Sequence, residues 1–175
     1  MLFLDNPDVF VAGDLLWYPI EGDNKTRTAP DALVAFGRPK GDRGSYLQWR
    51  EGGIAPQVVF EVLSPGNRFG EMARKFAFYE RFGVEEYYQL NPDPLALQGW
   101  RRQGEELIEI PEMNGWISPR CGIQFELSGD DLRVLGPDGR PFQTYLEVVS
   151  RAEEAERRAR RLAEQLRALG IDPEA

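Results

Sequence analysis

Two acidic residues and one lysine in the first half of the chain suggest its chemistry. Asp31 follows Pro30 and precedes a short apolar run, and Glu61 lies inside the otherwise apolar run 57–63. An acid in such a strand is costly to bury unless a cation, hydrogen bonds or a metal ion compensate it. Lys75 follows in a stretch with helical spacing. Two carboxylates and one lysine are the minimum set for magnesium-dependent hydrolysis of a phosphodiester.

Two of these residues also have simple structural explanations. Asp31 follows a proline, as turn and cap residues often do. Lys75 lies one helical turn from Glu71 and from Tyr79. An exposed Glu71–Lys75 ion pair, worth roughly a few tenths of a kcal/mol, is therefore the alternative to catalysis. Glu61, in the middle of a strand, has no comparable explanation. The catalytic interpretation requires Lys75 to point back toward Glu61.

Composition restricts the metal and the compartment. The chain has 175 residues, no histidine and one cysteine, Cys121. The usual zinc sites, serine-type triads and an intramolecular disulfide framework are therefore excluded, and oxygen ligands favour magnesium, manganese or calcium. No loop has the dense Asp/Asn spacing of a calcium-binding domain. Because no secretory signal or apolar run near the ~18 residues of a membrane span is visible, we expect a cytoplasmic protein without a membrane segment.

A predicted strand–helix–strand unit positions the acids and the lysine. The strand 57–63 is broken at 64–66, and apolar residues then recur at helical spacing over 69–82. Gly83 is typical of a helix end, and the next strand covers 85–90. Further strands are predicted at 9–12, 15–18, 32–36, 95–102, 106–111, 123–127 and 132–135. We expect the first two to form a bent or hairpin-like pair. The fold class is then α/β or α+β, a mixed β-sheet flanked by helices.

The C-terminal part has a different pattern, which predicts a domain over 1–142 and a separate coiled-coil-like helix over 143–170. Apolar residues alternate by three and four at Tyr145, Val148, Ala152, Ala155, Ala159, Leu162, Leu166 and Leu169. This is the heptad pattern of a coiled coil, with acid-first ion pairs on its surface. The alternatives are self-association, a partner helix, or packing of this helix on its own domain.

The central residues together resemble the Uma2 family of restriction-endonuclease-like proteins within the PD-(D/E)XK nuclease superfamily. The resemblance rests on Ala29-Pro30-Asp31, on the run from Val59 to Arg68, and on Glu71, Lys75, Tyr79, Gly83 and Glu86-Tyr87-Tyr88. It implies a restriction-endonuclease-like core in which Asp31, Glu61 and the main-chain carbonyl of Val62 bind magnesium or manganese.

The resemblance also implies that Lys75 is a relocated catalytic lysine, since Leu63 stands where a Glu-x-Lys lysine would lie. The residues expected to shape the substrate pocket or its rim are Ser64, Asn67, Arg68 and Tyr79. Asp14 and Glu21 are candidates for an additional upstream acid.

Two functions are consistent with these features. The first is a magnesium-dependent endonuclease that hydrolyses DNA, acting as a homodimer because cleavage of both strands favours paired sites. The second is a non-catalytic module that keeps the nuclease fold and assembles through its C-terminal helix. The net charge of −8 favours the second, because phosphate binding normally needs a positive surface. A local basic patch would still permit the first. The position of Lys75 discriminates between them.

Overall fold

The computed structural model describes residues 2–64, 69–142, 154 and 156–165. The chain divides into one unit over residues 1–140 and a second over 141–175. Among the described residues, no helix is long and apolar enough to cross a membrane. The elements of the first unit are β1 (Val9–Gly13), β2 (Trp17–Tyr18), β3 (Ala32–Phe36), β4 (Tyr46–Leu47), a 3-10 helix (Gln48–Arg50), β5 (Val58–Val62), α1 (Phe69–Arg81), β6 (Glu86–Pro92), β7 (Leu95–Gln103), β8 (Glu106–Glu109), β9 (Gln124–Ser128) and β10 (Asp131–Leu135).

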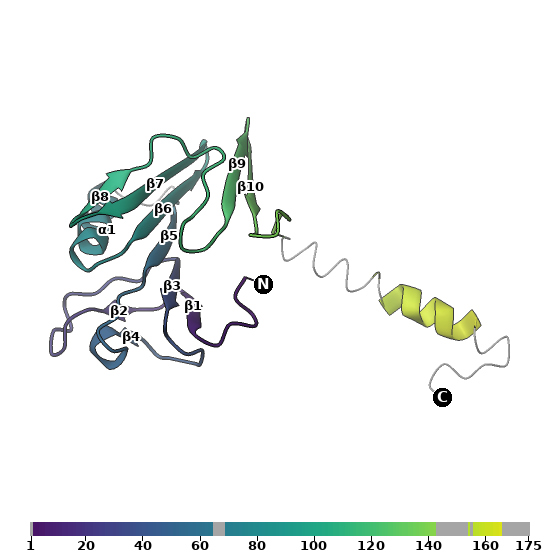
Figure 1. The fold of residues 1–175 in the computed structure, drawn as a ribbon, viewed down its shortest axis with the longest axis horizontal. Coiled ribbons are helices and arrows are strands. Elements are labelled where there is room, and N and C mark those ends of the chain that lie inside the picture. Colours follow the sequence, from purple (N-terminus) through teal and green to yellow (C-terminus); the bar gives the residue numbers. More distant parts are fainter. Residues whose placement is uncertain (1, 65–68, 143–153, 155, 166–175) are drawn as a thin grey trace. The chain divides into compact units, whose positions relative to one another are not determined.

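The first unit contains a six-stranded mixed sheet with the strand order β1-β3-β5-β6-β7-β8 (Figure 1). Only β5 and β6 pair in parallel within it, and the other neighbours are antiparallel. A parallel pair needs a crossover, and α1 supplies it between β5 and β6. The predicted mixed sheet with a covering helix is therefore confirmed.

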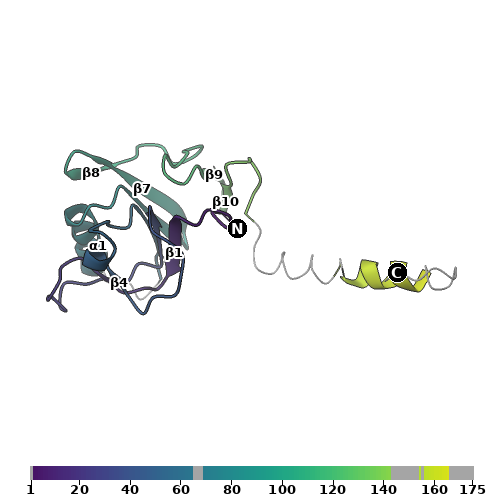
Figure 2. The same ribbon diagram turned by 60° about the horizontal axis from the view of Figure 1, so that its bottom comes forward.

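Apolar side chains cover both faces of this sheet. On one face, Tyr79 and Phe76 of α1 pack against Val59, Tyr87 and Trp100. Figure 2 shows α1 on one side of the strands. The helix ends at Arg81, and Gly83 just beyond it has a φ of +93°, the left-handed conformation typical after a helix end.

The opposite face packs against the segment between β8 and β10. Tyr88 and Val58 of the sheet contact a cluster that includes Ile110, Met113 and Phe125. Strands β9 and β10 form a separate two-stranded sheet beside it. Each face of the central strands therefore has its own covering layer.

The predicted pairing of the first two strands is wrong. β1 pairs antiparallel with β3, and β2 pairs in parallel with β4. The chain turns at Asp14, which has a φ of +51°. Its N–H donates to the carbonyl of Asp31 at 3.3 Å, so the chain leaves the sheet instead of returning along β1.

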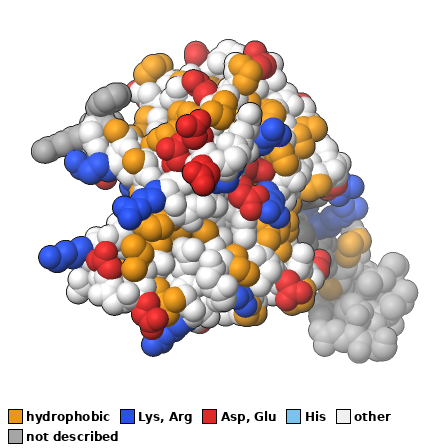
Figure 3. Space-filling model, turned by 60° about the vertical axis from the view of Figure 1, so that its left-hand side comes forward, with side chains coloured by type: hydrophobic (Ala, Val, Ile, Leu, Met, Phe, Trp, Pro, Cys, Tyr) orange, Lys and Arg blue, Asp and Glu red, His pale blue; other side chains and the backbone are white. Residues whose placement is uncertain are grey.

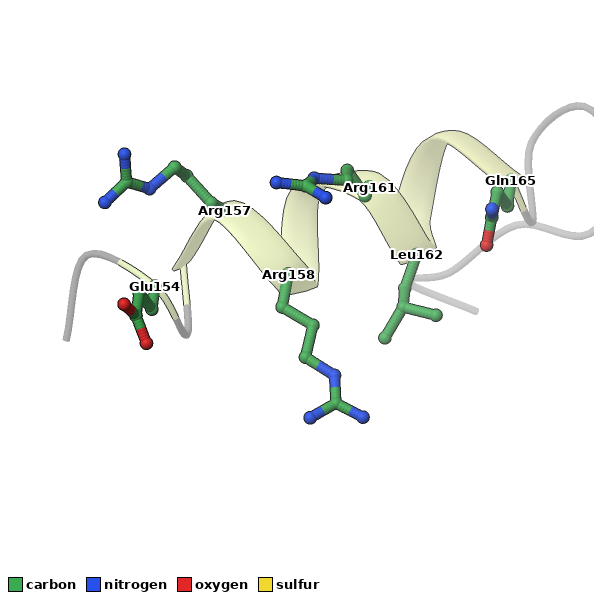
Figure 4. Close-up of a pocket in the computed structure, with 6 residues that line it drawn as sticks. All are labelled: Glu154, Arg157, Arg158, Arg161, Leu162 and Gln165. Carbon is green, nitrogen blue, oxygen red and sulfur yellow. The ribbon is translucent and has the colours of Figure 1, made fainter. Parts of the chain in front are cut away.

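The described part of the second unit is helical at residues 154 and 156–165. Figure 4 shows Arg158 and Leu162 projecting from one side of this helix, while Arg157 and Arg161 point away from them. Of the predicted heptad positions, Ala159 and Leu162 are described, and the other six lie outside the described residues.

Candidate active site

The sheet brings the two predicted acids together at one end of β3 and β5. The strands are antiparallel, with Ala32 opposite Phe60. One residue further along this register, Asp31 falls beside Glu61. Oδ2 of Asp31 accepts a hydrogen bond from the N–H of Val62 at 2.6 Å. The main chain of β5 therefore fixes the Asp31 carboxylate, which the turn after Pro30 places at this strand end.

Lys75 reaches this pair from α1. Its Nζ lies 2.8 Å from Oε2 of Glu61 and donates a second hydrogen bond to the carbonyl of Ala29 at 3.2 Å. The lysine side chain is 18% exposed and that of Glu61 is 3% exposed. Among the described residues, the ion pair of Lys75 is thus with Glu61, not with Glu71. The orientation that the catalytic interpretation requires is the one the structure shows.

Tyr79 lies beneath Glu61, not at the rim where it was expected. Its hydroxyl donates a short hydrogen bond to Oε1 of Glu61, and its side chain is fully buried. The ring stacks on Trp17 and contacts Tyr87. Helical spacing puts Tyr79 one turn after Lys75, so both side chains point to the same strand. Tyr79 therefore positions Glu61 and does not touch solvent.

Burial and neighbouring charges oppose one another at Glu61. Burial raises the pKa of its carboxyl, the Lys75 ammonium and the Tyr79 hydroxyl lower it, and the nearby Asp31 carboxylate raises it. Burial, together with the Glu61 charge, raises the pKa of Tyr79. The tyrosine hydroxyl therefore stays protonated at neutral pH and remains a hydrogen-bond donor to the carboxylate.

The predicted rim is only partly described. Ser64 is exposed just after β5, whereas Asn67 and Arg68 lie outside the described residues. In the described part of the chain, no group of three or more His, Cys, Asp or Glu side chains could hold a metal ion. Asp14 contributes its main-chain N–H to Asp31 but completes no such group. The oxygen donors near one another are the two carboxylates, and the carbonyl of Val62 belongs to the same strand end.

Sequence reasoning missed two glutamines in the same row of the sheet. Gln89 of β6 is the register partner of Glu61, and Gln98 of β7 is the partner of Gln89. The available signal was the alternation of strand 85–90, which puts Gln89 on the same face as Tyr87.

The chain is similar to one protein family in sequence and to a solved structure in fold. The model of the Uma2 family, described as "Putative restriction endonuclease", matches residues 2–134. The chain belongs to the Uma2 family. A similar crystal structure, from Anabaena variabilis, is described as that of "a putative nuclease belonging to DUF820". It is 19% identical with a TM-score of 0.47, and the match covers 67% of this chain and 63% of that one.

The chain thus spans less than two thirds of the length of that Anabaena protein. No curated protein matches the chain. In this Uma2 member, the acids at the ends of β3 and β5 and the lysine of α1 form the candidate site among the described residues.

Proposed function

We propose that this Uma2 protein is a magnesium- or manganese-dependent endonuclease that hydrolyses DNA phosphodiester bonds. The observation that carries the proposal is the position of Lys75. Its ammonium lies 2.8 Å from a buried glutamate, in the row that also holds Asp31. A lysine that served only as a surface charge on α1 would have solvent or Glu71 as its partner. Instead, a cation and two acids from three separate elements meet at one end of the sheet.

The donor atoms suit a hard divalent cation. Asp31, Glu61 and the carbonyl of Val62 offer only oxygen, which magnesium and manganese prefer. Such a cation would activate water and stabilise negative charge on the phosphoryl group. Each carboxylate oxygen has two lone pairs, so the hydrogen bonds from Val62, Lys75 and Tyr79 leave room for a cation.

The protein's own groups have separate tasks in this proposal. The N–H of Val62 holds Asp31, and Tyr79 holds Glu61, so both carboxylates are oriented before substrate binds. Lys75 has three N–H donors, of which two bond Glu61 and Ala29. The third can bond a phosphate oxygen, where the ammonium stabilises the charge that develops during attack.

The charge distribution allows a nucleic-acid substrate despite the net charge of −8. On the face drawn in Figure 3, Lys and Arg side chains lie on both sides of an indentation at the left margin. Basic side chains gathered locally can attract a phosphate backbone even on an acidic protein. We therefore propose DNA as the substrate. We also propose a reducing compartment such as the cytoplasm, because the buried thiol of Cys121 has no second cysteine to pair with in this sequence.

Relaxation of supercoiled plasmid DNA in magnesium tests the proposed activity. We expect cleavage by the wild type that is abolished by EDTA, by Glu61→Gln and by Lys75→Met. The matched controls are Glu109→Gln, an exposed acid on the edge strand β8, and Arg81→Met, an exposed cation at the far end of α1. Both controls should cleave like the wild type. Wild-type protein without activity toward DNA would favour the non-catalytic assembly module.

We further propose that the C-terminal helix joins two copies of the chain. Leu162 is 52% exposed, and Glu154 with Arg158 and Glu156 with Arg160 have acid-first spacing for surface ion pairs. A leucine this exposed at a heptad position is typical of a helix that packs against a partner helix. Sedimentation of the full chain should give a dimer, which Leu162→Glu disrupts and Gln165→Glu does not. A monomeric wild type would contradict this proposal and leave the nuclease proposal standing.

A further inference from the structure

A row of polar side chains continues across the sheet beyond the two acids. In the register of the strands, Asp31, Glu61, Gln89 and Gln98 follow one another on β3, β5, β6 and β7. Residues that are direct register partners point to the same face. The face that carries the acids therefore carries two carboxamides on the side away from Asp31.

Lys75 and Tyr79 of α1 hydrogen-bond to the Glu61 end of this row. Phe76 of α1 packs against Tyr87 and Trp100, which are one row back on β6 and β7. Exposure then increases along the polar row. Glu61 is buried, Gln89 is half-buried and Gln98 is exposed. The polar row is therefore increasingly accessible to solvent from Glu61 toward Gln98.

Hydrogen bonds orient the two carboxamides. The Tyr87 hydroxyl donates to Oε1 of Gln89 at 3.0 Å, and Nε2 of Gln89 donates to Oε1 of Gln98 at 3.5 Å. The oxygen of each glutamine is therefore engaged from within the protein. The amide nitrogen of Gln98 has no acceptor among the described residues and remains a donor. The row thus presents acceptors at Asp31 and Glu61 and a neutral N–H donor at Gln98.

We propose that Gln98, oriented by Gln89, binds a phosphate oxygen of the DNA strand next to the bond that is cleaved. A phosphodiester offers only acceptors, so it can pair with the N–H donor of Gln98 without added charge. Two strand spacings separate Glu61 from Gln98, roughly 10 Å, so Gln98 contacts a neighbouring phosphate and not the scissile one. Gln98 is a substrate-binding residue and Gln89 a positioning residue. The inference rests on the proposed nuclease function.

Steady-state cleavage of a short DNA duplex in magnesium tests the role of Gln98. Gln98→Ala should raise KM about fivefold, as expected for one hydrogen bond, with little change in kcat. The slope of log KM against log salt should stay unchanged, because no charge is removed. Gln103→Ala is the matched control, since Gln103 is also exposed on β7 but projects from the opposite face. It should leave both constants unchanged.

A double-mutant cycle tests the role of Gln89. Gln89→Leu should raise KM less than Gln98→Ala, and adding it to Gln98→Ala should have no further effect, because Gln89 acts through Gln98. Active variants with unchanged KM would overturn this inference alone. Independent, additive effects would overturn the positioning role of Gln89. A wild type that neither binds nor cuts DNA would overturn the nuclease proposal and this inference with it.

Discussion

Glu61 and Glu86 are two buried glutamates on neighbouring strands, with different partners. Glu61 on β5 is 3% exposed and Glu86 on β6 is 1% exposed. They point to opposite faces of the sheet, because Glu61 is the register partner of Gln89 and Glu86 that of Val58. Glu61 has an ammonium and a tyrosine as partners and lies beside a second acid.

The groups that donate hydrogen bonds to Glu86 are neutral, although the Arg120 guanidinium also interacts with its charge. Its carboxylate accepts hydrogen bonds from the hydroxyls of Tyr88 and Ser118 and from the N–H of Arg120. Ser118 in turn accepts a bond from the N–H of Cys121. These bonds attach the turn 118–121 to β6 and leave the carboxylate no evident chemical task. Burial of an acid therefore does not by itself mark a candidate catalytic site, and the partners of the carboxylate distinguish the two glutamates.

The largest expected difference between the two glutamates is in activity. Glu61→Gln should lower the rate of plasmid cleavage on the order of a thousandfold, because it removes a charged ligand at the reacting phosphate. Glu86→Gln should retain the wild-type rate per folded molecule. Initial rates of supercoil relaxation, normalised to the folded fraction, measure both. Equal losses in the two variants would remove the distinction between the sites.

For the free energy of unfolding we expect the opposite ranking, with the larger loss on substitution of Glu86. Glu86→Ala leaves the Tyr88 and Ser118 hydroxyls and the Arg120 N–H without their acceptor, so we expect a loss of about 3 kcal/mol in the free energy of unfolding. Urea unfolding followed by tryptophan fluorescence measures it. Glu105→Ala, at an exposed turn, is the control and should change stability little. A Glu86→Ala protein as stable as the wild type would show that the turn needs no such attachment.

Tyr79→Phe sharpens the account of how Glu61 is held. The substitution keeps the ring in its stack on Trp17 and removes only the hydrogen bond to the carboxylate. We expect about a tenfold loss in kcat with little change in KM, because the bond orients Glu61 and does not bind substrate. Tyr87→Phe, which loses its bond to Gln89, should affect KM instead. An unchanged kcat in Tyr79→Phe would contradict the positioning role.

The smallest expected effect is a pH dependence of the free energy of unfolding that arises from Cys121, close to Glu86. Burial and the Glu86 charge raise the pKa of the Cys121 thiol from 9.0 to about 12. The folded protein therefore holds the proton more tightly than the unfolded chain does. The contribution of Cys121 to stability is complete below pH 9 and is lost as the pH rises toward 12.

The matching measurement is urea unfolding at pH 8 and pH 10 for the wild type and Cys121→Ala. From pH 8 to pH 10, the free energy of unfolding should fall by about 1 kcal/mol more in the wild type than in the variant. Parallel losses would show that the thiol titrates in the folded protein as it does in the unfolded chain.

Much of the candidate site at the β3–β5 end was predictable from local pattern, and the Glu86 side was not. Helix α1 follows from the spacing of its apolar residues, and Glu61 is conspicuous as an acid in an apolar strand. Glu86 begins its strand after another acid and looks like a solvent-exposed strand end. Its burial depends on Ser118 and Arg120, which are 32 and 34 residues away and contact it only through tertiary packing.

Other features of the site depended on long-range pairing. That Asp31 lies beside Glu61 follows from the β3–β5 register, which no local pattern encodes. The depth of Tyr79 follows from its packing on Trp17, a residue of β2 that pairs with β4 and not with β1 as expected. Gln89 and Gln98 become neighbours of the acids only once the strand order is known.

Calorimetric titration of magnesium is the most direct test of the claim that Asp31, Glu61 and Lys75 form the chemical site. We predict binding by the wild type that is lost in Glu61→Gln and retained in Glu86→Gln. Binding that persists in Glu61→Gln, or that disappears only in Glu86→Gln, would contradict the assignment of the metal to the β3–β5 end of the sheet.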